Sequence, residues 1–230
     1  MYFHHSPEIW RDFPELVPGV LVAQGITGDV AVGERVAEFS RIAEERLATA
    51  SESEFPEIQA WRRAFSRMGL KPTGYRCASE SLLRRFRKER ALPPIHPLID
   101  LCNATSLAFA IPVAVLDVSK IAGGINVHYA SGDERYVAFS GDIEHPDPHE
   151  VIFADDAGQA HARRWTNRQS GASAVRETTS DVLIVAEALH DSASADIERL
   201  IAALAHELNA TWSVTPKSAM LSQSSPRFEF

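Results

Sequence analysis

Residues 97–130 have the sequence PLIDLCNATSLAFAIPVAVLDVSKIAGGINVHYA, and within this stretch the apolar pattern changes from helical to extended. A proline opens residues 97–110, which suits the first turn of a helix, and we predict a helix there. Residues 113–118 and 124–129 are short apolar or alternating runs, a pattern typical of strands. The chain is therefore predicted to pass from a helical part to a β-rich part near residue 111.

The same division continues on both sides of this stretch. Upstream, a short strand at residues 16–24 precedes three predicted helices at residues 33–50, 56–68 and 79–90. Downstream, strands are predicted at residues 135–139, 151–154 and 181–187, followed by an amphipathic helix at residues 194–208. Helices that come first and strands that come later favour an α+β fold over a regular βαβ alternation.

We therefore predict a single α+β domain over residues 1–230, with N-terminal helices packed on a mixed or antiparallel sheet. Residues 215–230 contain few apolar side chains and are predicted to be a mobile tail. The chain has 230 residues, 45% of them hydrophobic, which is enough for one full core.

Composition also restricts the compartment and the class of protein. Residues 1–10 contain two histidines, a proline and a glutamate where a signal peptide needs a basic start and an apolar run. No segment approaches the ~20 apolar residues that cross a bilayer, so no membrane partner is expected. Two cysteines, Cys77 and Cys102, are too few for a disulfide framework or a four-ligand zinc site. These features predict a reduced, cytoplasmic protein.

The charge is distributed unevenly along the chain, whose net charge is −8. Ten of the 23 basic residues but only two acidic residues, Glu80 and Glu89, lie between Arg62 and Arg90, so this segment carries a charge near +8. Such asymmetry fits a surface that binds a polyanion. It equally fits two solvated helix faces, and charge alone does not separate the two interpretations.

Most signatures of catalysis are absent. The chain has no phosphate-binding P-loop, no GxGxxG after a strand, no GxSxG and no HExxH. The segment His145-Pro-Asp-Pro-His149-Glu150 contains possible metal ligands, but its proline-rich spacing favours a polar surface loop over a metal site. No metal and no cofactor are expected.

Two other stretches carry polar residues of interest. Asp100 and Asn103 lie three apart on an otherwise apolar predicted helix, so they share one face, either as a structural network or as the floor of a ligand pocket. Residues 163–171, RRWTNRQSG, combine arginines with a tryptophan, which suits a phosphate and a stacked base or sugar. A surface loop with a packed tryptophan is the alternative.

Taken in order, these stretches resemble the B3/B4 editing domain of the phenylalanyl-tRNA synthetase β subunit. The synthetases carry a run of the type VDxxNxxxxxxGxPxHxxDxxKIxGxIxVRxAxxGE, similar to residues 99–134 here, followed by a strand that ends in an LDG-like turn, similar to residues 139–141. A V-x-A-D-D strand resembles residues 151–156, and a small-residue loop leading to a strand resembles residues 170–187. Residues 75–85 look like the Y-R-x-S-x-E-x-L-L-R-R run of free-standing members. The resemblance covers about residues 58–190.

The resemblance implies a trans-acting deacylase that hydrolyses the ester of a mischarged tRNA, with the amino acid in a pocket. It assigns the pocket asparagine to Asn103 and the turn glycine to Gly141, which we take as the catalytic candidates. In the synthetases this domain hydrolyses tRNA mischarged with tyrosine, but two departures remove the expectation of tyrosine specificity. Ala114 replaces the family histidine, and the Gly-Gly-Glu that reads the tyrosine hydroxyl is replaced near Arg168-Gln169-Ser170.

Free-standing members of the family act on tRNAs that carry other amino acids, including the arginine analogue canavanine. A cationic side chain would need an acidic residue in the pocket, and Asp100, Glu134 and Glu187 are candidates. Backbone N–H groups at Gly123, Gly124 or Gly141 are candidates for stabilising the oxyanion.

We therefore predict a pocket between the Asp100–Asn103 helix and the strands near Gly141 and Arg168. The predicted substrate-binding residues are Asp100, Gly123, Gly124, Glu134, Arg168, Gln169, Ser170 and Glu187. The predicted tRNA-binding residues are Arg62, Arg63, Arg67, Arg76, Arg84, Arg85, Arg87 and Lys88. A non-catalytic protein that binds tRNA or a free amino acid is the alternative, and the sequence does not distinguish it from an enzyme.

Overall fold

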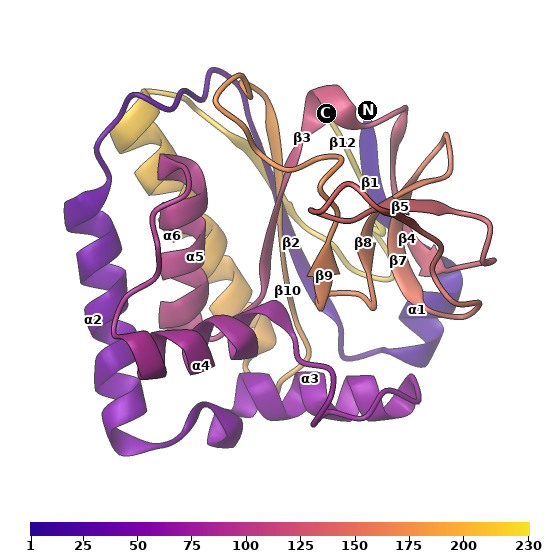
Figure 1. Cartoon of the computed structure of the whole chain (residues 1–230), viewed down its shortest axis with the longest axis horizontal. Coiled ribbons are helices and arrows are strands. Elements are labelled where there is room, and N and C mark those ends of the chain that lie inside the picture. The colour runs from indigo at the N-terminus through magenta and orange to yellow at the C-terminus, as the bar shows by residue number, and fades with distance from the viewer.

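The computed structural model describes residues 1–230 and contains six α-helices and twelve strands (Figure 1). The helices are α1 (Pro7–Asp12), α2 (Gly33–Thr49), α3 (Pro56–Arg67), α4 (Ala78–Glu89), α5 (Pro97–Phe109) and α6 (Ala193–Trp212). The strands are β1 (Tyr2–His5), β2 (Val17–Ala23), β3 (Val113–Asp117), β4 (Gly124–Tyr129), β5 (Arg135–Val137), β6 (Ile143–Glu144), β7 (Val151–Asp155), β8 (Gln159–Arg163), β9 (Arg168–Gln169), β10 (Val182–Ala188), β11 (Lys217–Met220) and β12 (Arg227–Glu229). Two single-turn 3-10 helices lie at Glu52–Glu54 and Val118–Lys120.

The strands form two sheets. The larger sheet has the order β12-β1-β4-β7-β8-β5-β6, with β9 paired to β8, and it is mixed because β1 runs parallel to β4 and β5 parallel to β8. The smaller sheet has the order β11-β2-β10-β3 and is antiparallel throughout. Each sheet combines strands from both ends of the chain.

The smaller sheet lies between helices α2, α5 and α6 on one side and the larger sheet on the other (Figure 1). One apolar cluster joins it to α5 and α6, and the largest cluster fills the space between the two sheets and reaches α3 and α4. β10 is buried over its whole length and contributes to both clusters. Because successive side chains of a strand point to opposite faces, Val185 and Glu187 face the space between the sheets, while Ile184 and Ala186 face α6.

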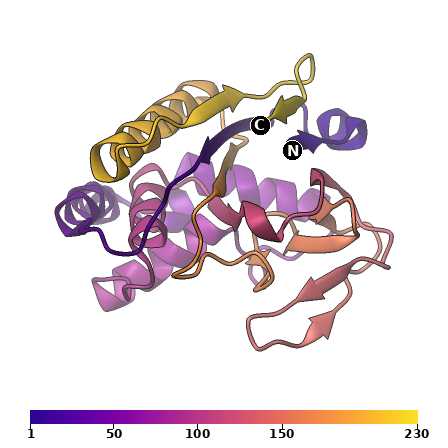
Figure 2. The same cartoon turned by 90° about the horizontal axis from the view of Figure 1, so that it is seen from above.

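The α+β prediction is confirmed, including the mixed sheet, and each helix and strand expected from residues 16 to 208 is present within a few residues of its predicted bounds. Residues 215–230 differ from the expected mobile tail, because they contain β11, which pairs with β2, and β12, which pairs with β1. The chain ends lie side by side (Figure 2), where the Met1 amino group donates to the Phe230 carbonyl at 2.7 Å. None of the helices is both long and apolar enough to cross a membrane.

Candidate functional site

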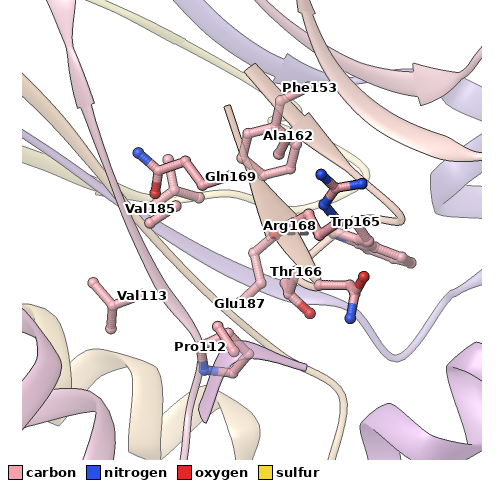
Figure 3. A pocket seen from close by; sticks show the side chains of 13 residues that line it. Pro112, Val113, Phe153, Ala162, Trp165, Thr166, Arg168, Gln169, Val185 and Glu187 are labelled. Carbon is pink, nitrogen blue, oxygen red and sulfur yellow. Dashed lines mark hydrogen bonds between the residues drawn. The ribbon is translucent and has the colours of Figure 1, made fainter. Parts of the chain in front are cut away.

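A small cavity opens between the two sheets, where β9 faces the ends of β3 and β10 (Figure 3). Its walls are mostly apolar and include Pro112, Val113, Phe153, Ala162 and Val185. Its polar lining consists of residues 166–169 and Glu187. The enclosed space is about 60 Å³, room for roughly four to six waters at about 10–15 Å³ each. An apolar cavity with a few convergent polar groups is the usual form of a small-ligand site.

Glu187 is the only carboxylate in the cavity lining, and only 2% of the residue is exposed. One carboxylate oxygen lies 2.6 Å from His5 Nε2, and the other accepts a hydrogen bond from Trp165 Nε1 at 2.9 Å. A carboxylate offers about four acceptor positions, so these two bonds leave Glu187 able to bind a ligand as well.

The partner of Glu187 on β1, His5, is also buried. Its second ring nitrogen, Nδ1, has no hydrogen-bond partner in the protein. A proton on Nδ1 would be buried and unsatisfied, which costs about 1–3 kcal/mol. The Nε2 atom is therefore the ring nitrogen through which His5 donates to Glu187.

The other partner of Glu187, Trp165, lies in a strained turn. Arg164 and Trp165 both adopt positive φ angles, 48° and 57°, a region in which bulky residues are rare. The surroundings that hold this turn include Trp61, whose ring is perpendicular to that of Trp165 with centroids 5.0 Å apart. Backbone strain of this kind clusters at functional sites, and here it directs the indole N–H at Glu187.

Arg168 and Gln169 form the side of the cavity contributed by β9. The Arg168 guanidinium donates two bonds to Glu144 at 2.9 and 3.0 Å and lies over the Tyr136 ring. The bond to Glu144 raises the pKa of Arg168, and Glu144 also accepts a bond from Arg163 at 2.6 Å. The Gln169 side chain donates to the Val115 carbonyl at 2.7 Å, which fixes β9 against β3.

Sequence analysis did not single out Thr166 or Asn167 as site residues, although both lie in the RRWTNRQSG stretch. The Thr166 hydroxyl oxygen is buried in the cavity lining and has no protein partner. Asn167 donates to the Arg76 carbonyl at 2.8 Å and so ties the cavity to the segment before α4. Ala114, which stands where the family motif has histidine, also lines the cavity, and no histidine does.

The structure does not form the predicted pocket between Asn103 and Gly141. Asp100 and Asn103 line a different and larger cavity, of about 560 Å³, between α2, α4 and α5. Asp100 also accepts the Ile95 backbone N–H at 2.8 Å, which caps the loop before α5. Gly141 lines neither cavity; it is exposed in the turn after β5, where its φ of 93° favours glycine. The helical spacing of Asp100 and Asn103 was right, but their face points away from the sheets.

Three more predicted substrate contacts have structural roles instead. A Cβ on Gly124 would lie 2.4 Å from the Tyr2 ring, and one on Gly123 would lie 1.9 Å from an Asp156 carboxylate oxygen, so close packing requires both glycines. Ser170 is fully buried and donates to the Val137 carbonyl at 2.8 Å. None of the three lines the cavity with Glu187.

Glu134, the fourth of these contacts, closes a loop. Its carboxylate accepts the backbone N–H groups of Ser131 and Gly132 at 3.0 and 3.1 Å. Burial acts to raise its pKa, but these N–H groups outweigh burial and hold the pKa below its usual value. Of the acidic candidates for a cationic side chain, Glu187 alone lies in the cavity.

In the folded chain, most of the arginines in the basic segment between Arg62 and Arg90 are paired with acidic residues. Glu52 pairs with Arg84 and Arg87 at 3.3 and 3.1 Å, although it lies outside the segment. The fully buried Glu80 pairs with Arg62 and Arg76, Glu89 pairs with Arg85, and Glu15 pairs with Arg67. Among the predicted tRNA-binding residues, only Arg63 and Lys88 make no ion pair, and both are exposed.

One group of possible metal ligands lies away from the cavity. Glu57, His190 and Asp196 have ligand atoms within 4.8 Å of one another. Arg46 bonds both Glu57 oxygens at 2.8 and 2.9 Å, and Arg199 pairs with Asp196. These guanidinium groups already balance the carboxylates, which fits a structural network better than a metal site.

Comparison with known proteins gives a family match. The family described as B3/4 domain matches residues 60–206, which include the whole cavity lining. The phenylalanine–tRNA ligase β subunit of Cereibacter sphaeroides is 36% identical over 66 residues, which are 29% of this chain and 8% of that protein. The corresponding subunit of Nitrobacter winogradskyi is 34% identical over 94 residues, 40% of this chain and 11% of that protein. The matched segments thus span about a tenth of these relatives.

A solved structure is also similar. It is an N-terminal fragment of the phenylalanyl-tRNA synthetase β subunit from Pyrococcus horikoshii, with 9% sequence identity and a TM-score of 0.49. The alignment covers 95% of this chain and 53% of that one.

Proposed function

The chain belongs to the B3/4 domain family, and from that premise we propose that it is a trans-acting aminoacyl-tRNA deacylase. Its substrate would be a tRNA whose terminal ribose is esterified with a non-cognate or non-proteinogenic amino acid. The observation that carries the proposal is the apolar cavity with the buried Glu187 carboxylate, lined by residues within the matched region. The relation to β subunits of a tRNA ligase supports a tRNA-linked role.

The proposed reaction is hydrolysis of an ester that is already activated. Water attacks the ester carbonyl carbon, the bond to the ribose oxygen breaks, and that oxygen leaves with a proton as a hydroxyl group. The protein's task is then mainly to hold the ester and to position the water. The Thr166 hydroxyl, which lacks a protein partner, and the Gln169 amide are the cavity groups suited to this task.

The cavity favours an amino acid with a cationic side chain, and the arginine analogue canavanine is a candidate. Glu187 places a carboxylate beside apolar walls, and Arg168, the other charged residue of the lining, pairs with Glu144 rather than with Glu187. A buried charge of this kind is stabilised by an opposite charge at hydrogen-bonding distance. A neutral amino acid would leave Glu187 without that partner.

We place the tRNA backbone along α3 and α4. The exposed side chains Arg63, Lys88 and Arg90 make no ion pair there, so their charges are available to phosphates. The arginines that pair with Glu52 and Glu80 are assigned to stabilising the helices instead.

A second function is a non-catalytic protein that binds tRNA or a free amino acid. The observation that favours it is the cavity lining itself, in which Ala114 replaces the family histidine and no other side chain offers a neutral base. An enzyme of this kind would therefore work without a histidine base.

The experiment is a deacylation screen with the purified chain across tRNAs charged with canavanine, arginine, lysine, tyrosine and other amino acids. Our proposal expects release of free amino acid with turnover, fastest for a cationic non-cognate side chain. Tight binding of charged tRNA without accelerated release from any of them would establish the binding protein instead.

A further inference from the structure

An open hollow adjoins the cavity on the side of β9. It has a volume of about 400 Å³ and is lined by Tyr136, Ala138, Phe139, Ser140, Arg168 and Gln169. Arg168 and Gln169 also line the cavity that holds Glu187, so the two spaces share a wall. The hollow therefore lies next to the cavity.

The most exposed aromatic side chain of the hollow is Phe139, with 66% of the residue open to solvent. It lies in the loop between β5 and β6, beyond their last paired residues, Val137 and Ile143. Burial of a phenylalanine side chain normally stabilises a fold, and this fold gains almost none of that stabilisation from Phe139. The exposed Phe139 ring therefore contributes little to the packed core.

The segment that carries Phe139 is nevertheless held in one conformation. The backbone N–H of Gly141 donates to the Ala138 carbonyl, and that of Ala138 donates to the Asp142 carbonyl, both at 2.9 Å. From the other side, Gly171 packs so closely that a Cβ there would lie 3.1 Å from the Ala138 carbonyl oxygen. An exposed aromatic ring on a fixed backbone is suited to stacking, because little conformational freedom is lost on binding.

The dimensions of the cavity determine what part of a substrate enters the hollow. Its volume of about 60 Å³ is on the scale of part of an amino-acid side chain and leaves no room for a nucleoside. In an aminoacyl ester the ribose is bonded directly to the amino-acid carboxyl, and the terminal base is attached to that ribose. Once the amino acid occupies the cavity, the base lies just outside it, and the hollow with Phe139 is a neighbouring space that shares Arg168 and Gln169 with the cavity.

We propose that Phe139 is a stacking platform for the terminal nucleobase of the tRNA. The assignment rests on the proposed deacylase function and adds a binding subsite to it. Stacking of one base on an aromatic side chain strengthens binding by roughly 5- to 100-fold. It is tolerant of which base is stacked, and it leaves the chemistry at the ester to the cavity residues.

The test compares Phe139→Ala and Phe139→Trp with the wild-type chain on two substrates. One is the charged tRNA that the wild type deacylates best, and the other is the ethyl ester of the same amino acid, which has no ribose and no base. Ile143→Ala is the matched control, because Ile143 is an exposed apolar residue of the same hairpin, 55% open, that does not line the hollow. Binding of an uncharged CCA trinucleotide to each variant is measured in parallel.

We expect Phe139→Ala to lower kcat/KM for the charged tRNA and the affinity for the trinucleotide by roughly 5- to 100-fold. Hydrolysis of the ethyl ester should stay within about twofold, and Phe139→Trp should restore both losses. Equal effects on the two substrates, or none on either, would overturn the subsite while leaving the deacylase standing. If the wild type hydrolyses no charged tRNA and does not bind the trinucleotide, the deacylase and the subsite both fail.

Discussion

The substitution Glu187→Gln separates the charge of the cavity from its shape. Glutamine is nearly isosteric with glutamate but has no charge, so a cationic substrate loses one charge-assisted hydrogen bond. Such bonds contribute about 1.5–3 kcal/mol, which corresponds to a loss of about 10- to 150-fold in kcat/KM. A neutral substrate should lose little, so the ratio of cationic to neutral kcat/KM should fall by about the same factor.

The cost to stability follows from the two donors that Glu187 accepts. Glutamine has one carbonyl oxygen, and Trp165 can only donate, so the amide is expected to direct its oxygen at Trp165 and its NH₂ group at His5. His5 must then move its proton to Nδ1, which has no protein partner. One buried unsatisfied N–H costs about 1–3 kcal/mol. For a chain of this size, the expected fall in Tm is about 2–12 °C.

The assay measures kcat/KM for tRNAs charged with canavanine and with a neutral amino acid, below the Tm of the variant. Glu134→Gln is the matched control: Glu134 is also buried and hydrogen-bonded, but it lies outside the cavity. That variant should lose stability and keep the substrate preference. A Glu187→Gln variant that is less stable yet keeps the wild-type preference would show that Glu187 belongs to the scaffold and does not read the side chain.

Three further outcomes follow from the structure. Asn103→Ala should leave the deacylation rate within about twofold, because Asn103 lines a cavity separate from Glu187; a single-turnover rate lowered 100-fold would restore it to the site. The double variant Lys88→Ala, Arg90→Ala should flatten the dependence of tRNA binding on salt by about two phosphate contacts. Arg62→Ala should instead mainly lower Tm, because it removes one ion-pair partner of the buried Glu80. Salt titrations in which Arg62→Ala flattens the dependence and the double variant does not would contradict these roles. Burial alone would raise the pKa of Asp196, but hydrogen bonds from its neighbours outweigh burial and lower that pKa to about 2. Because its folded pKa lies below the unfolded one, Asp196 stabilises the fold above about pH 4 and loses that contribution as the pH falls towards 2. Tm measured over this range should therefore fall less steeply for Asp196→Asn than for the wild type.

Most of the helices and strands between residues 16 and 208 could be predicted because their apolar pattern is strong, but α1, β1 and the buried strand β8 were not predicted. The strands at the chain ends have a different basis. β11 and β12 pair through their backbones with β2 and β1, while most of their side chains remain exposed. Backbone pairing leaves no apolar pattern in the sequence, so residues 215–230 were predicted to be a mobile tail.

The candidate site shows the same limit. Glu187 was among the predicted residues because a cationic side chain would need an acidic residue in the pocket, but its partner His5 lies 182 residues away in the chain. That contact depends on the packing of β1 near β10, which no local pattern encodes. Asn103 was assigned to the wrong pocket. Helical spacing correctly placed Asn103 on one face of α5 with Asp100, but spacing alone does not show that this face meets α2 and α4.

The central claim is that the chain catalyses release of an amino acid from tRNA, and the amount released per protein molecule tests it most directly. Canavanine-charged tRNA is mixed with the purified chain at about fifty tRNA molecules per protein, and free canavanine is measured over time against a sample without protein. We predict that each protein molecule releases many amino acids, at a rate far above spontaneous hydrolysis. If release is no faster than in the protein-free sample, or is slowed in proportion to the tRNA bound, the chain is a binding protein and not a deacylase of this substrate.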